Sequence, residues 1–137
     1  MLVCMYCGET YDKSKVSFYE DNEWNQCPKN NCDGYLLDID EEILPQIILL
    51  NNKGYSTQYC CQGHMNDSVV RLYILFECEY SFDTLPKGFI TEENTTDNRT
   101  CISFSPKGKS DKQKYKKLLK ARTDLYDWVN KLEYNNY

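Results

Sequence analysis

The clearest alternation of apolar and polar residues lies in the middle of the chain, in the segment VVRLYILFECEY (69–80). A period of two residues is typical of a β-strand with one buried face, and charged residues occupy the opposite face here. Shorter strands are predicted at 55–61 and 100–105, and a further one at 89–93. The side chains predicted to be buried on the long strand are those of Val70, Leu72, Ile74, Phe76, Cys78 and Tyr80.

Two other stretches have the apolar spacing of an α-helix. In DIDEEILPQIILLNNKG (38–54), acidic residues suit the start of a helix and Gly54 suits its end. Pro45 either begins the regular part of this helix or kinks it. A second helix is predicted at 110–134, with a capping box that starts at Ser110. Its predicted apolar stripe consists of Tyr115, Leu118, Leu119, Leu125, Tyr126, Val129 and Leu132.

The predicted order of a Cys-rich ribbon, a helix, several strands and a second helix indicates an α+β fold. We expect an N-terminal four-cysteine zinc ribbon over residues 1–37. Over residues 38–137 we expect a small, mostly antiparallel sheet covered by two helices and packed against the ribbon. Within the ribbon, VSFYE (16–20) and residues 23–26 are predicted to form a hairpin around an Asp-Asn turn.

Four of the eight cysteines form two closely spaced pairs. CMYC contains Cys4 and Cys7, and CPKNNC contains Cys27 and Cys32. A hairpin's length of chain separates the pairs, so four thiolates can meet around one tetrahedral Zn²⁺ ion. Polar turn residues around the pairs disfavour buried, unligated thiols, and no thioredoxin-like βαβ pattern follows Cys4. We therefore predict one structural zinc ion, in a site with no open position for chemistry.

The composition and the first residues indicate the compartment. The opening stretch MLVCMYCGET lacks the basic and apolar regions of a signal peptide, and the longest aliphatic run, 47–50, is too short to span a membrane. We therefore expect a cytoplasmic protein without membrane association. In that reducing compartment, cysteines favour metal binding over disulfides.

The segment YCCQGH (59–64) contains the only histidine of the chain. Cys61 and His64 suit either a second metal ion, which would need two distant ligands, or a nucleophile and its base. For a nucleophile, Gly63 would supply an oxyanion donor and Asp67 would orient the imidazole. Because both patterns are short, we predict instead a turn between two strands that presents His64 to a partner.

Charge is unevenly distributed along the chain. Residues 1–105 contain seven Lys and Arg against seventeen Asp and Glu, whereas residues 106–137 contain nine against four. An acidic surface suits a basic protein partner and repels nucleic acid, whereas a basic helix can contact phosphates. The predicted partner contacts are Asp38, Asp40, Glu41, Glu42 and His64. The predicted basic helix surface contains Lys112, Lys116, Lys117 and Lys120.

The segment LLNNKGYSTQYCCQGH (49–64) follows an acidic and aliphatic helix. Its pattern, LN-x-KGY-x-T-x-x-CC-x-GH, resembles small phage and prophage proteins of low-GC Gram-positive bacteria, which often begin with a zinc ribbon. The patterned part covers residues 1–80. In length, composition and ribbon the chain is similar to phage-encoded anti-CRISPR metalloproteins that act on type II RNA-guided nucleases.

This resemblance implies a non-catalytic inhibitor in the cytoplasm of a bacterial host, which binds a CRISPR effector nuclease and blocks its DNA binding. We expect it to be a monomer. The alternative is a zinc-ribbon module that binds RNA or DNA through the basic helix, with Tyr115 available for stacking on bases. A third interpretation is an RNA-modifying enzyme. YSTQYCCQGH is similar to the T-x-SSCSGR segment of wybutosine-synthesis tRNA methyltransferases, with Cys60, Gln62 and His64 replacing two serines and the arginine.

Overall fold

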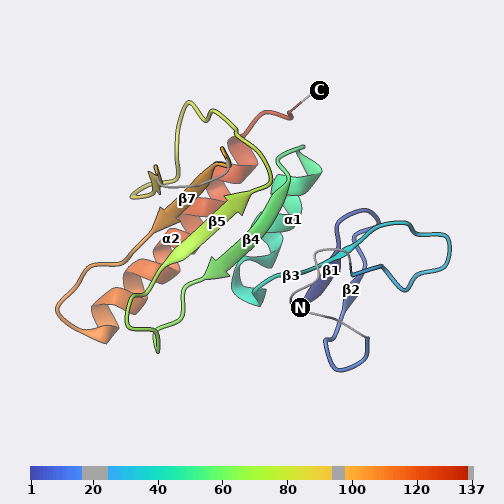
Figure 1. The fold of residues 1–137 in the computed structure, drawn as a ribbon. Coiled ribbons are helices and arrows are strands. Elements are labelled where there is room, and N and C mark those ends of the chain that lie inside the picture. Colours follow the sequence, from blue (N-terminus) through green and yellow to red (C-terminus); the bar gives the residue numbers. More distant parts are fainter. Residues whose placement is uncertain (17–24, 94–97, 136–137) are drawn as a thin grey trace.

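The computed structural model describes residues 1–16, 25–93 and 98–135, and its fold is α+β, as the sequence predicts. Two antiparallel sheets and two α-helices make up the described part of the chain. The smaller sheet, formed by the N-terminal residues, lies to one side of the larger domain (Figure 1). The hairpin predicted at 16–26 falls mainly on residues outside the described ranges.

The smaller sheet has three short strands in the order β2-β1-β3, and both pairs are antiparallel. They are too short to be predicted from the sequence, because two or three residues among turn-forming residues show no periodicity. The strands are β1 (Leu2–Cys4), β2 (Thr10–Tyr11) and β3 (Leu36–Asp38).

The side chains of β1 alternate between two hydrophobic cores. Leu2 and Cys4 are buried with Cys27 and Leu36 in a small core inside the ribbon. Val3 points the other way, is 1 % exposed, and belongs to the core of the larger domain. Packing on both faces of one strand therefore joins the ribbon to the larger domain.

The larger sheet has four antiparallel strands in the order β4-β5-β7-β6. They are β4 (Thr57–Gln62), β5 (Leu72–Phe76), β6 (Ile90–Thr91) and β7 (Cys101–Phe104). Strand β5 shows the predicted alternation, with Leu72, Ile74 and Phe76 fully buried. It is shorter than predicted, because the chain bends at residues 77 and 78. Cys78 is consequently exposed, so its predicted burial is wrong.

A 3₁₀ turn, η1 (Glu41–Ile43), leads into helix α1 (Leu44–Asn52). Pro45 lies in the first turn of α1, where its fixed φ suits a helix and its missing N–H is not needed, so it begins the helix rather than kinking it. After the helix, Gly54 has a φ of 92°, as expected for the residue that follows a helix C-cap. The acidic residues at 38–42 therefore lie before α1, in β3, in the connection that follows it and in η1, and not in the first turn of α1.

Helix α2 (Asp111–Lys131) begins where the sequence predicts and ends a few residues earlier. Ser110 is the N-cap, and its hydroxyl accepts a hydrogen bond from the backbone N–H of Gln113 at 3.2 Å. The side-chain oxygen of Gln113 accepts in turn from the N–H of Lys109 at 2.8 Å. The first bond satisfies an N–H group that the first helical turn leaves without an intrahelical partner, and the second fixes the chain that enters the helix.

The buried face of α2 differs from the predicted stripe. Tyr115, Leu119 and Tyr126, predicted to be buried, are 47 %, 42 % and 42 % exposed. Arg122 takes an interior position instead, because its guanidinium finds backbone carbonyl acceptors there. The buried residues of α2 are Leu118, Ala121, Arg122, Leu125, Trp128 and Val129.

Both helices contribute to a core against the larger sheet (Figure 1). Ile47 and Leu50 of α1 and Leu118 and Leu125 of α2 are fully buried there together with the inward side chains of β5. Burying one such side chain contributes roughly 1.5–3 kcal/mol. The ribbon core contains only two aliphatic residues among its buried members, so it gains far less from hydrophobic burial than the larger domain. Within the described ranges, neither helix is long and apolar enough to cross a membrane.

Candidate metal centre

Cys4, Cys7, Cys27 and Cys32 come together in the ribbon, as their spacing predicts. Their four Sγ atoms all lie within 4.8 Å of one another. The Sγ atoms of Cys4 and Cys32 are 3.7 Å apart, and those of Cys7 and Cys27 are 3.8 Å apart. Each of these contacts joins one member of the first pair to one member of the second, and all four thiols are free. The cluster is compatible with a metal ion.

Backbone N–H groups near the cluster donate hydrogen bonds to two of the sulfur atoms. The N–H of Cys7 donates to Cys4 Sγ and the N–H of Gly34 donates to Cys32 Sγ, both at 3.4 Å. Such outer hydrogen bonds orient metal ligands. A Cβ atom on Gly34 would lie 2.6 Å from Cys4 Sγ and 2.5 Å from Tyr6 Cβ. Only glycine lets this loop approach the sulfur so closely.

Two of the thiols have opposite pKa shifts. Burial raises the pKa of Cys4 to about 12. Burial also acts on Cys27, but the Tyr11 hydroxyl, 3.4 Å from its Sγ, and the Lys29 backbone N–H outweigh it and lower the pKa to about 7. Cys27 is therefore deprotonated more readily than Cys4. A bound metal would displace the proton from the more basic thiol.

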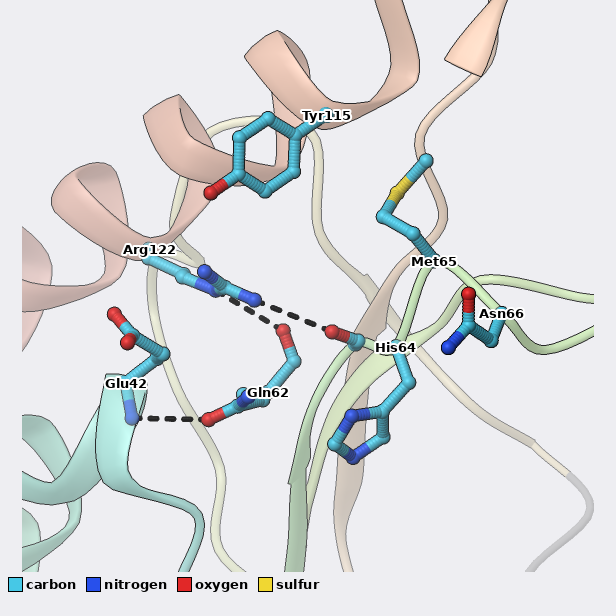
Figure 2. Close-up of a pocket in the computed structure, with 8 residues that line it drawn as sticks. Glu42, Gln62, His64, Met65, Asn66, Tyr115 and Arg122 are labelled. Carbon is cyan, nitrogen blue, oxygen red and sulfur yellow. Dashed lines mark hydrogen bonds between the residues drawn. The ribbon is translucent and has the colours of Figure 1, made fainter. Parts of the chain in front are cut away.

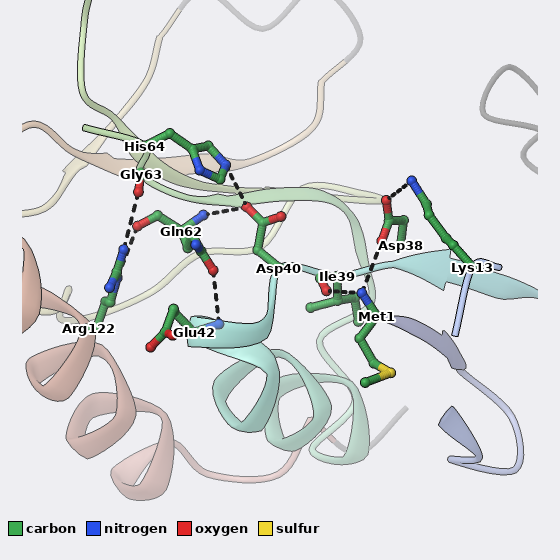
Figure 3. A network of polar contacts seen from close by, with 10 residues as sticks. All are labelled: Met1, Lys13, Asp38, Ile39, Asp40, Glu42, Gln62, Gly63, His64 and Arg122. Carbon is green, nitrogen blue, oxygen red and sulfur yellow. Dashed lines mark hydrogen bonds and ion pairs between the residues drawn. The ribbon is translucent and has the colours of Figure 1, made fainter. Parts of the chain in front are cut away.

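A second group of metal-ligating side chains lies where the sequence predicts a partner-binding turn. His64 Nε2 lies 3.3 Å from Asp40 Oδ2, and the two side chains face each other in Figure 3. One donor atom from each of Asp40, Cys61 and His64 lies within 4.8 Å of the other two. His64 is exposed, and the other two residues are half-buried. Asp40 could not be identified as a member from the sequence, because no local spacing links it to Cys61.

The electrostatic surroundings of Cys61 disfavour its interpretation as a nucleophile with His64 as its base. The carboxylate 3.3 Å from the imidazole is that of Asp40, whereas the sequence suggests Asp67, whose backbone N–H donates to the carbonyl oxygen of His64 at 3.1 Å. Burial raises the pKa of the Cys61 thiol, and the negative charges of Asp40 and Asp67 raise it further. A reactive cysteine requires the opposite shift.

Arg122 of helix α2 forms hydrogen bonds to the backbone of the turn that carries His64. Arg122, only 8 % exposed, donates to the carbonyl oxygens of Gln62 at 3.1 Å and Gly63 at 3.2 Å. Gly63 has a φ of 86°, and a Cβ atom there would lie 2.9 Å from Leu118 Cδ1. The glycine in the segment CQGH was a visible signal of this turn, whereas the inward Arg122 was not.

The predicted acidic partner contacts differ in their availability. Asp38 accepts from the Lys13 ammonium at 2.6 Å, and Asp40 accepts from a backbone N–H at the end of β4 at 2.9 Å. Both carboxylates therefore serve contacts within the chain. Glu41 and Glu42 are exposed in η1 and leave carboxylates at the surface.

The predicted basic surface is exposed along the first half of α2. Lys112 and Lys116 are exposed there. Lys117 donates to a backbone carbonyl in the preceding loop. Lys120 forms an ion pair with Asp124 one turn later, at 3.2 Å. Two of the four predicted lysines thus have partners inside the chain.

No protein-family model matches the chain, and comparisons with curated proteins and with solved structures find no significant match. The metal-ligating residues and the charged surfaces are therefore the features that bear on function.

Proposed function

We propose that Cys4, Cys7, Cys27 and Cys32 bind one structural Zn²⁺ ion. Thiolates about 2.3 Å from a tetrahedral zinc ion are separated from one another by about 3.8 Å. The observed separations of 3.7 and 3.8 Å between sulfurs of different pairs agree with that value. This agreement is the observation that carries the proposal. Four thiolates fill the coordination sphere, so this ion stabilises the ribbon and does no chemistry.

Metal analysis of the purified full-length chain tests the structural zinc. We expect Cys4→Ser to lower the zinc content by one ion per chain, because a tetrahedral ligand is lost. Cys78→Ser is the matched control, since that thiol is exposed and lies outside the cluster, and it should leave the zinc content unchanged. Equal zinc contents in the wild type, Cys4→Ser and Cys78→Ser would contradict the proposal.

We further propose that the protein acts by binding a basic surface of a protein, with an RNA-guided type II nuclease as the partner implied by the resemblance of the chain. Such nucleases hold their guide–target duplex in a positively charged channel. The excess of acidic residues over 1–105 favours association with a surface of that kind. Because Asp38 and Asp40 are engaged within the chain, Glu41 and Glu42 are the acids of this cluster that remain for a partner.

Nucleic acid is the second candidate partner, and one observation favours it. Tyr115 is 47 % exposed on α2 between exposed Lys112 and Lys116. Lysines around an exposed aromatic ring can hold a phosphate backbone while the ring stacks on a base. The net negative charge of the whole chain opposes this binding at long range.

Paired charge reversals separate the two partners. For a type II nuclease loaded with guide RNA, Glu41→Lys with Glu42→Lys should weaken binding more than about tenfold, and Lys116→Glu with Lys117→Glu should change it little. For single-stranded RNA or duplex DNA alone, the lysine reversal should be the damaging one, and affinity should fall steeply with salt. Binding to bare nucleic acid that is lost on the lysine reversal would refute the protein-partner proposal.

A further inference from the structure

Three different kinds of metal ligand meet at the end of β4. Asp40 comes from the segment before η1, Cys61 from β4 itself, and His64 from the turn that follows. Their donor atoms lie within 4.8 Å of one another, and the imidazole Nε2 is 3.3 Å from the carboxylate Oδ2. A carboxylate oxygen, a thiolate and an imidazole nitrogen are all ligands for borderline divalent ions.

We propose that Asp40, Cys61 and His64 form a second metal site for Zn²⁺ or a similar divalent transition ion, separate from the ribbon. Oxygen and nitrogen ligands each about 2.0–2.1 Å from a tetrahedral ion lie about 3.3 Å apart. The imidazole and the carboxylate are already at that separation. A thiolate and a carboxylate together neutralise the two charges of the ion, so the bound site carries no net charge.

The Asp40 carboxylate and the backbone on both sides of the site are held in place by hydrogen bonds within the chain. The backbone N–H of Gln62 donates to Asp40 Oδ2 at 2.9 Å and holds the carboxylate in place. The side-chain oxygen of Gln62 accepts from the N–H of Glu42 at 2.9 Å, which fixes η1 to the end of β4 (Figure 3). Arg122 donates hydrogen bonds to two backbone carbonyl oxygens of the same turn. Supporting contacts of this kind are what orient the ligands of metal sites.

The second site differs from the ribbon in leaving a coordination position open. Three protein ligands are one fewer than a tetrahedral ion requires, and the exposed His64 leaves solvent access to the fourth position. A shallow pocket of about 260 Å³ is lined by His64 together with Glu42, Tyr115 and Arg122, among others, but not by Asp40 or Cys61 (Figure 2). The fourth ligand is therefore water or an oxygen donor of a small molecule or partner that enters from solvent. An open zinc site of this kind can polarise the bound group.

Metal titration of the full-length chain tests this site. With Zn²⁺ in excess followed by removal of loosely bound ion, we expect two ions per chain in the wild type. The affinity for the second ion should fall more than about tenfold in each of the variants Asp40→Asn, Cys61→Ser and His64→Gln. The first ion should remain in the ribbon. Cys78→Ser is the control for an exposed thiol and should retain both ions.

Cobalt supplies a second measurement that does not depend on stoichiometry alone. The second equivalent of Co²⁺ should add a thiolate-to-cobalt absorption band weaker than that of the first, because one sulfur replaces four. This added band should be absent in Cys61→Ser, while the ribbon band persists. His64→Gln changes an exposed side chain, so it should retain the thermal unfolding temperature of the wild type and separate ligand loss from misfolding.

Two results would overturn the second site. One is a wild-type chain that holds a single ion under saturating Zn²⁺. The other is a second ion that all three ligand variants keep with unchanged affinity, which would show adventitious binding elsewhere. Neither result bears on the ribbon, because its zinc is counted separately through Cys4→Ser.

Discussion

Lys53 Nζ lies 2.9 Å from the carbonyl oxygen of Val129, so the residue that caps α1 also caps the end of α2. The same ammonium donates to the carbonyls of Asn130 at 2.9 Å and Leu132 at 2.7 Å. The last carbonyls of a helix lack intrahelical partners and carry partial negative charge, which an ammonium satisfies well. Lys53 is 6 % exposed, so water cannot readily replace it.

Replacing Lys53 should therefore be costly. We expect Lys53→Met to keep most of the packing but to lower the free energy of unfolding by about 2–4 kcal/mol, because buried carbonyls lose a charged donor. Urea unfolding followed by circular dichroism measures this change. Lys87→Met, at an exposed lysine, is the control and should stay within about 0.5 kcal/mol of the wild type. An equally small effect of Lys53→Met would mean that water forms hydrogen bonds to the carbonyl oxygens at the end of α2 in place of the ammonium.

The ribbon should depend on its metal for folding. Its own core has few aliphatic side chains, and metal affinity in small modules is folding energy. We expect Cys27→Ser to lower the melting temperature and to reduce the response of the melt to a chelator. The wild type should lose stability when the chelator is added. A wild-type melting curve that a chelator leaves unchanged, in protein shown to have released its zinc, would contradict a structural role.

Two glycines with positive φ permit a controlled test of the turn below α2. Gly63 and Gly8 have φ values of 86° and 78°, but only at Gly63 would a Cβ atom meet Leu118. Gly8→Ala should cost about 1 kcal/mol from backbone strain alone. Gly63→Ala should cost more, by a further 1–3 kcal/mol or so, because overpacking is added to the same strain. Equal losses in unfolding free energy would show that Leu118 yields to the added methyl group.

How far the sequence predicts this fold depends on whether the information is local. The four-cysteine cluster was predictable, because each pair forms a knuckle within a few residues. The helices were predictable from periodicity, but the buried face of α2 was not. Tyr115 and Leu119 fit an apolar stripe, yet the helix turns Arg122 inward. The preference of that guanidinium for backbone carbonyls of a distant turn is a tertiary effect that no pattern along α2 encodes.

The ion pair between Arg71 and Glu92 should make stability depend on pH in the acid range. Arg71 Nε donates to Glu92 Oε1 at 2.8 Å. Burial would raise the pKa of Glu92, but the hydrogen bond from Arg71 outweighs it and holds the pKa below its ordinary value of 4.5. A lowered pKa contributes stability above the ordinary value, and this contribution is lost as the pH falls through the folded-state pKa.

Glu92→Gln tests that dependence. The variant should be less stable than the wild type near neutral pH, and the difference in unfolding free energy should shrink as the pH falls to about 3. Any loss of metal from the ribbon at low pH affects both proteins alike, so the difference isolates Glu92. A difference that stays constant across this range would show that the carboxylate gains nothing from its charge in the folded state.

The second group of ligands shows the same limit of local patterns. Cys61 and His64 were visible as a pair, whereas Asp40 was indistinguishable from its acidic neighbours. The hydrogen bond from the backbone N–H of Gln62, at the end of β4, holds that carboxylate beside the imidazole. Asp38, two residues away, instead turns toward Lys13. Neighbouring acids of one cluster therefore have different roles.

Because side chains of β1 alternate between two cores, the ribbon cannot simply be replaced by a zinc ribbon from another protein. A foreign zinc ribbon grafted onto this domain would have to present an aliphatic side chain at the position of Val3, between two residues that face its own metal core. A graft that supplied only the four cysteines would leave a cavity in the core of the larger domain, where the side chain of Val3 is now buried. Protein engineers who recombine such parts would have to carry over the strand together with the metal-binding loops, because the joint between the two parts lies inside the strand.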